Sequence, residues 1–526
     1  MSLSSSIRAV RAYSRNADNA YTANTSKFAA RMGDVLARTW DLGFTAFGGP
    51  PVHFQIAHRR FVEGTHGRIP WIDERVYQEL FAICQALPGP GSTKMLFCIV
   101  NLHAGIVPAI ITFLLWSLPG AIGMFGLALG VQQIDEVLPA PAYAFLSGLN
   151  ASTVGIVALA AVQLAEKAIK DRLTRVLVIF GATFGMCYSA LWYFPLLIVA
   201  GGIVTVVWDL WLQQRISSWR AQRAEKKRQA NTAAVAPDPG ATEEAASQPI
   251  ELPERTVGKP GPITCSHEKR RHAAQASNQV QATQESAPAT AIDSDRTDVQ
   301  SYAIPVPIGL TIIAVFFASF IAILVTRGVL TSPPRPLDLF ANMYLAGTII
   351  FGGGPVVIPL LREYVVEPGW VSPRDFLIGL AIIQAFPGPN FNFAIFLGAL
   401  AVLGTPNSTV LGAFIGYAGI FTPGIVLAVG FQSLWGVLRK QRAVTSLLRG
   451  INATAVGLVF TAVYRLWEIG YLSQDASNGQ SLGRDPWWVV VTALTYASNA
   501  WFGVPPPVAI VAGGVLGLSW YGAVGS

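Results

Sequence analysis

An internal duplication of helix-breaking motifs constrains the fold of this chain more than any other feature of its sequence. Five short motifs occur in the same order in each half, and the copies at 47–52, 85–90, 119–120, 148–155 and 199–202 return at 351–356, 384–389, 423–424, 450–457 and 511–514. The recurring residues are mainly glycine and proline inside apolar segments. Such a pattern is typical of membrane transporters that are built from two structural repeats.

The composition favours a polytopic membrane protein. Hydrophobic residues make up 52% of the chain and charged residues only 13%, whereas an average soluble domain has about 25% charged residues. The net charge of +7 is modest, and the basic residues collect in a tail and in loops. We therefore do not expect nucleic-acid binding, and we expect an all-α protein whose main partner is the lipid bilayer.

The apolar segments form two sets of six, with one additional segment between the sets. They are predicted at 34–57, 78–103, 106–132, 141–165, 173–190 and 193–213, at 305–326, and at 337–361, 377–403, 407–437, 443–467, 486–501 and 504–523. Each bilayer-spanning helix needs roughly 20 mostly apolar residues, so we expect about 13 helices in two homologous six-helix repeats. The segments that carry Gly-Gly-Pro or Pro-Gly-Pro could be broken or re-entrant instead of simple spans.

The chain divides into five predicted regions. They are a cytosolic basic tail at 1–33, a first repeat at 34–213, a disordered cytosolic linker at 214–303, a linking transmembrane helix at 304–327 and a second repeat at 328–526. Residues 220–301 contain no Phe, Tyr or Trp, and such a stretch cannot bury enough apolar surface to fold. The Arg- and Ser-rich tail fits a cytosolic tail or a mitochondrial presequence. The plasma membrane is the location we expect.

The extra helix predicts that the two repeats are inverted. Six crossings return the chain to its starting side, and the seventh delivers the second repeat to the opposite side. A cytosolic N-terminus places the basic residues at 167–175 and 439–442 inside, as the positive-inside rule requires. The arginines at 59, 60, 68 and 75 would then lie outside, which counts against this orientation.

The four helix breaks are the first candidates for a binding site. Their residues are Gly48, Gly49, Pro50, Pro88, Gly89 and Pro90 in the first half, and Gly352, Gly353, Gly354, Pro387, Gly388 and Pro389 in the second. Broken helices survive in a bilayer only where protein or a water-filled cavity satisfies their backbone groups. Free N–H groups at helix N-termini would suit an anion. The alternative is that glycine only permits close helix packing and proline only bends the helix.

Lys94 is the strongest single candidate for binding an anion. It lies in an apolar segment shortly after Pro90, where an ammonium group is costly unless it faces a cavity or a partner. Together with Ser92 and Thr93 it would form a small oxyanion-binding cluster. The matching stretch of the second half, which contains Asn390 and Asn392, is polar but uncharged. The alternative is a lysine that extends to the membrane interface.

Other polar residues inside apolar segments have two interpretations each. Asn150 and Asn452 occupy matching positions, and Gln85 and Gln384 precede the two Pro-Gly-Pro motifs. All four amides could bind substrate or join neighbouring helices through hydrogen bonds. His53 could carry a proton, because its charge changes near neutral pH, or it could be structural.

The paired motifs resemble the chromate ion transporter family. The resemblance rests on residues 47–50 with His53, 59–62, Trp71 and 85–90 in the first half, and on 351–355, 359–361, 365–366, Trp370 and 384–389 in the second. It covers about 30–210 and 335–525. It implies a two-domain secondary transporter that moves chromate, with sulfate as a competing anion.

The chain departs from that family in three places. These are the long linker, the insertion Gly64 to Pro70, and Lys94 at a position where bacterial relatives are expected to have glutamine. The linker and Lys94 suggest a eukaryotic member, such as a fungal one. The direction of transport and the anion preference stay open.

We therefore expect a secondary transporter that moves chromate by alternating access between its two repeats. Phosphate-binding loops, zinc-ligand spacings and serine-hydrolase motifs are absent from the sequence, so we expect neither an enzyme nor a cofactor or metal. The coupling ion, with H⁺ as one choice, and the oligomeric state stay open. The alternatives are an anion channel, a transporter of another inorganic anion, and a non-transporting membrane scaffold or sensor that works through its linker.

Overall fold

The computed structural model describes residues 8, 10, 12–47, 49–64, 68–133, 138–188, 193–213, 215–216, 218–219, 222–226, 304–350, 361–383, 385–438 and 440–524. Residues 1–216 together with 299–526 make up one compact unit, and 217–298 make up a second. Most of the segment predicted as a linker therefore lies outside the described residues.

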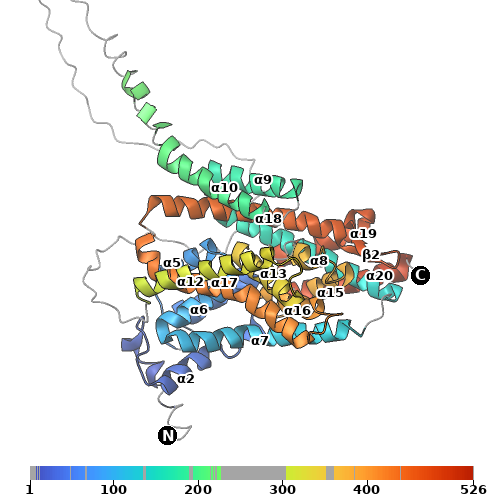
Figure 1. Ribbon diagram of the computed structural model, residues 1–526, viewed down its shortest axis with the longest axis horizontal. Helices are drawn as coiled ribbons and strands as arrows, with labels where there is room; N and C mark the ends of the chain where they lie inside the picture. Colours follow the sequence, from blue (N-terminus) through green and yellow to red (C-terminus); the bar gives the residue numbers. More distant parts are fainter. Residues whose placement is uncertain are drawn as a thin grey trace, which may run out of the picture. The chain divides into compact units, whose positions relative to one another are not determined.

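Helices account for nearly all of the first half (Figure 1). They are α2 (Phe28–Thr39), α3 (Leu42–Thr45), α4 (Gly49–His58), α5 (Glu74–Ala86), α6 (Gly91–Ala104), α7 (Ile106–Val131), α8 (Ala140–Ala168), α9 (Arg172–Cys187) and α10 (Tyr193–Val207). Short π-helical turns extend α4 over Arg59–Gly64 and α10 over Trp208–Leu212.

The second half repeats this series after one additional helix. Its helices are α12 (Val306–Val329), α13 (Arg335–Ile349), α15 (Pro373–Ile383), α16 (Phe393–Ala401), α17 (Thr409–Leu438), α18 (Arg442–Ile469), α19 (Pro486–Phe502) and α20 (Pro506–Val524). A short 3-10 turn, Asn390–Asn392, leads into α16. The additional helix α12 lies where the linking span is predicted.

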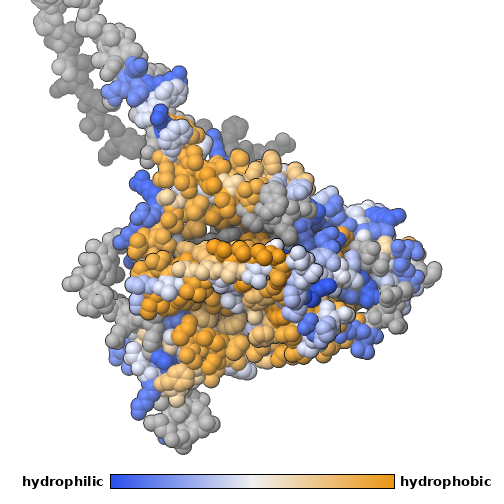
Figure 2. Space-filling view, in the orientation of Figure 1, coloured by the Kyte–Doolittle hydropathy of each residue, from blue (hydrophilic) through white to orange (hydrophobic). Residues whose placement is uncertain are grey.

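Six of the described helices, α7, α8, α12, α17, α18 and α20, are long and apolar enough to cross a membrane. Many of their large side chains face outward, among them Val315, Phe317 and Ile321 of α12. Figure 2 shows the resulting broad apolar surface over α7, α10 and α12. Apolar side chains that point away from the protein interior are expected where lipid is the solvent.

Three of the four segments with Gly-Gly-Pro or Pro-Gly-Pro motifs are broken, as the sequence allows, and the fourth motif, at 352–355, lies outside the described residues. The first break separates α3 from α4, the second separates α5 from α6, and the third separates α15 from α16. Gly89 and Gly388 have φ values of +94° and +90° at the second and third breaks. Glycine adopts this backbone conformation without the steric cost that a side chain imposes.

The two repeats exchange helices. Helix α8 of the first repeat packs against α19 and α20 of the second, and α18 of the second packs against α9 and α10 of the first. A Cβ atom on Gly148 of α8 would lie 2.1 Å from the carbonyl oxygen of Gly513 in α20. A Cβ atom on Gly450 of α18 would lie 2.2 Å from the carbonyl oxygen of Gly201 in α10. The duplicated glycines therefore allow two matching close helix crossings.

This exchange divides the helices into two groups, each of which contains parts of both repeats. The exchanged bundle consists of α8, α9, α10, α18, α19 and α20, and the core consists of α2–α7, α12, α13 and α15–α17. The groups meet mainly where α15 lies against α8 and where α5 lies against α18.

Among the described residues, one small hairpin departs from the predicted all-helical architecture. Strands β1 (Tyr471–Ser473) and β2 (Ala476–Gln480) pair antiparallel between α18 and α19. The backbone at Leu472 also exchanges two hydrogen bonds with the Ser147 hydroxyl of α8. The hairpin therefore closes one end of the exchanged bundle.

Candidate functional site

Three helix breaks meet around one small inner cavity. The cavity has a volume of about 10 Å³ and is lined by Pro50, His53, Pro90, Gly91, Ser92, Pro389, Asn390 and Phe391. These residues come from α4, from the start of α6 and from the turn before α16. Motifs far apart in the sequence thus converge on one point, and these three breaks are among the four that the sequence analysis took as candidates for a binding site.

His53 joins the parts of this cavity. Its Nε2 lies 3.2 Å from the carbonyl oxygen of Ala46, and its Nδ1 lies 3.1 Å from the Ser92 hydroxyl. The Ala46 carbonyl also accepts a 2.9 Å hydrogen bond from the N–H of Gly388 in the other repeat. The imidazole packs edge-on against Trp116, with 4.8 Å between the ring centres. Because a carbonyl oxygen only accepts, Nε2 carries a proton.

The N-terminus of α6 supplies free backbone donors to the cavity. Helix α6 begins at Gly91, and no side chain caps this end. Its first hydrogen bond is donated by the N–H of Lys94 to the Pro90 carbonyl. The preceding N–H groups therefore have no partner within the helix. An N-terminus of this kind favours an anion.

The Lys94 ammonium group is directed away from the inner cavity. Its Nζ donates to the carbonyl oxygens of Leu87 and Pro88 at 2.6 and 2.8 Å. The side chain has no solvent exposure, so it does not extend to a membrane interface. Lys94 thus ties the start of α6 to the Pro-Gly-Pro loop in front of it.

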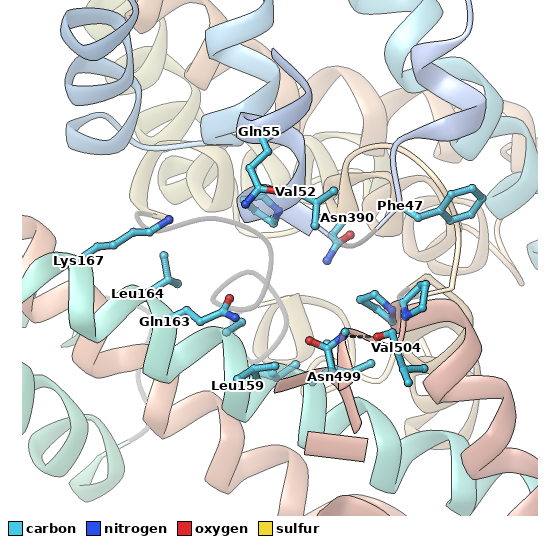
Figure 3. A pocket seen from close by; sticks show the side chains of 18 of the residues that line it. Phe47, Val52, Gln55, Leu159, Gln163, Leu164, Lys167, Asn390, Asn499 and Val504 are labelled. Atoms are coloured by element: carbon cyan, nitrogen blue, oxygen red, sulfur yellow. Dashed lines mark hydrogen bonds between the residues drawn. The ribbon is translucent and has the colours of Figure 1, made fainter. Parts of the chain in front are cut away.

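A larger cavity of about 510 Å³, the vestibule, leads to this site. Its core wall includes Gln55 and Asn390, and its bundle wall includes Gln163, Lys167 and Asn499. Figure 3 shows these side chains facing the cavity from opposite sides. Pro50 and Asn390 line both the vestibule and the inner cavity, so the two spaces adjoin.

The mouth of the vestibule carries two unpaired cations. A pocket lined by Gln55, Arg59 and Lys167, among others, adjoins the vestibule through Gln55 and Lys167. Among the described residues, no acidic side chain forms an ion pair with Arg59 or Lys167. Two acidic residues also line these spaces: Glu63 at the mouth, which contacts His58 Nδ1 at 3.0 Å, and Glu166 in the vestibule.

Other predicted site residues contribute to packing. The Thr93 hydroxyl accepts from the Trp116 indole at 3.0 Å, and Asn392 donates to the Ser117 carbonyl at 2.9 Å. Asn150 donates to the Gly470 carbonyl at 3.1 Å in the exchanged bundle. Asn452 is half-buried and lines neither cavity. Joining of helices is the role that the contacts of Asn150 and Asn392 favour.

Other predicted residues lie beside the cavity, against α7 or outside the described residues. Gln85 lies beside the cavity, because its Oε1 would be 3.2 Å from a Cβ atom on Gly91. Pro387 contacts α7, since its carbonyl oxygen would be 2.7 Å from a Cβ atom on Gly120. Residues Gly48, Gly352, Gly353, Gly354 and Gln384 lie outside the described residues.

Sequence reasoning missed the bundle wall of the vestibule. Gln163 interrupts an apolar helix, which could have identified it as a polar residue facing a cavity. Asn499 lies close to the turn between α19 and α20, where its Nδ2 donates to the Val504 carbonyl at 2.8 Å. Nothing in the sequence indicates that this turn meets α4 and α8, because the meeting depends on the helix exchange.

Comparisons with known proteins agree with this arrangement. The sequence profile of the family described as "Chromate transporter" matches residues 33–206 and 337–518. The chain is 24% identical over 425 residues to the chromate transport protein of Pseudomonas aeruginosa, which covers 81% of this chain and 78% of that protein. It is 24% identical over 429 residues to the chromate transport protein of Cupriavidus metallidurans, and the match covers 80% of this chain and 79% of that protein.

A shorter relative corresponds to a single repeat. The uncharacterized transporter YwrB of Bacillus subtilis is 28% identical over 173 residues, which is 31% of this chain but 85% of that protein. No solved structure matches the chain.

Proposed function

The chain belongs to the chromate transporter family, and we propose that it moves chromate or a closely related tetrahedral oxyanion across a membrane by secondary transport. Membership makes it a transporter and not an enzyme. Two relatives of similar length are named chromate transport proteins, and this supports chromate as the substrate. Sulfate, which has the same shape and charge, is the competing anion we expect.

The convergence of helix breaks at the base of the vestibule carries this proposal. The α6 N-terminus offers backbone N–H groups, and Ser92 and Asn390 add side-chain donors around the same cavity. Donors of this kind can bind an oxyanion without a fixed positive charge. Lys94 acts on this site indirectly, by fixing the loop from Leu87 to Pro90.

The size of the inner cavity supports alternating access. A volume of about 10 Å³ holds roughly one water molecule, so an oxyanion needs the site to widen. The adjoining vestibule is far larger, at about 510 Å³. A site that is accessible from one side and tightly packed beyond is the arrangement that a transporter needs between its two open states.

We further propose that the two repeats are inverted and that the vestibule opens toward the cytosol. Arg59 and Lys167 line one pocket, so the loop after α4 lies on the same side as the end of α8. Arg449, in the second turn of α18, pairs with Asp171 and Asp209 on that side. If α4 brings the chain back to the cytosolic side without crossing the membrane, the arginines at 59, 60, 68 and 75 lie in the cytosol. They then no longer oppose the orientation that the charges predict.

The bodies that move are the core and the exchanged bundle, rather than the two repeats. Both cavity-lining breaks of the first repeat lie in the core, whereas Gln163, Lys167 and Asn499 lie in the bundle. The vestibule is thus a gap between these groups. Because each group contains helices from both repeats, one repeat cannot move as a unit without separating α8 from α19 and α20.

Chromate uptake by the full-length protein in liposomes tests the proposal. We expect saturable uptake that sulfate inhibits and that an ion gradient can drive against the chromate gradient. Purely passive, non-saturating conductance would identify a channel instead. No chromate movement by correctly inserted protein would overturn the substrate assignment, and transport retained after deletion of 227–298 would exclude a scaffold that works through its linker.

A further inference from the structure

We propose that His103 and Asp34 form a buried proton-binding site that couples proton movement to oxyanion transport. This inference rests on the proposed function and names its coupling ion. His103 lies at the end of α6 and Asp34 lies in α2, and their exposed fractions are 2% and 1%. Neither residue lines the inner cavity or the vestibule.

The hydrogen-bond geometry requires an additional proton at this pair. His103 Nδ1 lies 3.1 Å from the carbonyl oxygen of Thr22, and its Nε2 lies 3.2 Å from Asp34 Oδ2. A carbonyl oxygen only accepts hydrogen bonds, so Nδ1 carries a proton. Nε2 then bonds to the carboxylate only if the imidazole is doubly protonated or if Asp34 itself is protonated. In either case the pair holds one proton more than a neutral histidine beside a carboxylate.

Arg38 already forms a buried ion pair with Asp34, but no hydrogen bond joins the two side chains. Its Nε lies 3.7 Å from Asp34 Oδ1, beyond hydrogen-bond distance, and both of these buried atoms lack a hydrogen-bond partner among the described residues. When the proton leaves, the Nε2 lone pair of His103 faces the carboxylate and repels it. Asp34 can then move the short distance to Arg38, which gives the cluster two discrete arrangements.

The surroundings of the pair contain few other charges. Arg38 packs over Trp71, whose ring stacks on His103 with 4.0 Å between the ring centres. The segment before α2 contacts His103 through its backbone, by the carbonyl of Thr22 and by the N–H of Asn24, which donates to the His103 carbonyl at 2.8 Å. Arg68 and Tyr13 act electrostatically on Arg38. The proton therefore experiences mainly Asp34 and Arg38.

The second repeat provides an internal comparison. Asp34 and Asp338 lie at the same distance before Phe47 and Phe351, the first residues of the duplicated Phe-Gly-Gly motifs. Asp338 accepts a 2.6 Å hydrogen bond from Nε of Arg327, and a guanidinium group is always charged in proteins. The duplicated carboxylates thus have different hydrogen-bond partners: Asp338 bonds to an arginine that is always charged, and Asp34 bonds to a histidine whose charge depends on a bound proton.

Two helices connect the proton site to the inner cavity. Helix α6 carries His103 at its end, whereas its first residues, Gly91 and Ser92, line the cavity. Helix α2 carries Asp34 and leads through α3 to Ala46, whose carbonyl holds both His53 and Gly388. A change in the contact between α2 and α6 would therefore move the two parts of the inner cavity that these helices hold: the start of α6, and the Ala46 carbonyl with His53 and Gly388.

Liposomes that contain the full-length protein and a trapped pH dye provide the test. Chromate uptake by the wild type should be accompanied by proton movement, and its rate should change several-fold with pH, because the charge of a histidine changes with pH. His103→Arg copies the fixed cation opposite Asp338. The His103→Arg variant should retain uptake down a chromate gradient but lose both the proton movement and the pH dependence. We expect the same retained uptake and the same two losses for Asp34→Asn.

Asp338→Asn is the matched control, because it removes the duplicated carboxylate but leaves the proton-binding pair intact. The Asp338→Asn variant should move the same number of protons per chromate ion as the wild type. Wild-type proton movement in both His103→Arg and Asp34→Asn would overturn the inference, with His103→Gln as the substitute if the arginine variant does not insert. Chromate uptake without proton movement in the wild type would also overturn it and would leave the proposed function intact. Absence of any chromate uptake would overturn both.

Discussion

The amide N–H of Gly89 donates to the carbonyl oxygen of Ile350 at 2.7 Å, and this bond joins the Pro-Gly-Pro loop of the first repeat to the second repeat. Its counterpart runs in the other direction, from the N–H of Gly388 to the carbonyl of Ala46 at 2.9 Å. Each loop is therefore held by the residue that precedes the Phe-Gly-Gly motif of the opposite repeat. This reciprocity explains why both motifs occur twice and in the same order.

Alanine at Gly89 or Gly388 should impair transport and stability. Both glycines have positive φ, and an L-residue in a left-handed conformation costs roughly 1–2 kcal/mol. A Cβ atom on Gly89 would also lie 2.7 Å from Gly424 Cα, and one on Gly388 would lie 3.0 Å from the Trp116 carbonyl oxygen. We expect a lower unfolding temperature and at least a tenfold loss of chromate uptake.

Gly126→Ala is the control for these substitutions. Gly126 lies within α7, and a Cβ atom there would meet nothing within 4 Å. Alanine is a better helix former than glycine by about 1 kcal/mol, so we expect equal or higher stability and unchanged uptake. Equal effects of all three alanines would show that the loops tolerate a side chain and that the proposed constraint is wrong.

Lys94→Met should destabilise the protein more than it alters affinity. It would leave the buried carbonyl groups of Leu87 and Pro88 without their donor, at a cost of about 1–3 kcal/mol for each group. Thermal unfolding and chromate KM, measured on the same preparation, separate the two roles. A large increase in KM with unchanged unfolding temperature would instead indicate that Lys94 binds the anion directly.

The sequence predicted the broken helices because helix breaks depend on local chemistry. Glycine and proline interrupt a helix wherever they occur in this pattern, and an unsatisfied backbone end needs a partner inside the bilayer. Pro50, His53, Pro90, Ser92, Pro389 and Asn390 were all predicted as site residues, and all line the inner cavity.

The bundle wall and the role of Lys94 could not be predicted in the same way. A buried lysine needs acceptors, but the sequence does not say whether these come from an anion or from the carbonyls of Leu87 and Pro88. Similarly, the duplicated glycines at 148 and 450 indicate close helix contacts without identifying the partners. Only the three-dimensional arrangement shows that each glycine contacts the opposite repeat, which brings Gln163 and Lys167 to the vestibule.

Neutralising the cations at the vestibule mouth should slow the capture of chromate. We expect Lys167→Gln and Arg59→Gln to lower kcat/KM by roughly two- to tenfold at low ionic strength, because unpaired cations raise the local anion concentration. Salt should reduce the difference from the wild type, since exposed charges are screened beyond about 10 Å at 0.1 M.

Lys170→Gln serves as the matched control, because Lys170 is exposed nearby but lines neither the vestibule nor its mouth. It changes the net charge of the protein by the same amount as Lys167→Gln. If both substitutions lower kcat/KM equally, the effect comes from the overall field of the protein and the mouth has no particular role.

Cross-linking can establish which bodies move during transport. The hydroxyl oxygens of Ser152 in α8 and Thr495 in α19 lie 3.0 Å apart, within the exchanged bundle but in different repeats. A disulfide in Ser152→Cys/Thr495→Cys should be tolerated if the bundle moves as one body. Gln55→Cys/Gln163→Cys, cross-linked by a bifunctional thiol reagent, would join core and bundle across the vestibule and should stop chromate uptake until the link is reduced.

The two cross-links distinguish the proposed movement from its main alternative. If one repeat moved against the other, the link between Ser152 and Thr495 would join the moving parts and abolish uptake. Each single cysteine variant, treated with the same reagents, controls for modification of the native Cys84, Cys98, Cys187 and Cys265. Uptake that survives the first link and is lost with the second is the result expected for a core that moves against the exchanged bundle. The reverse result would require α8 and α18 to separate from the helices they now contact, and the glycine crossings at Gly148 and Gly450 would then have to open in every transport cycle.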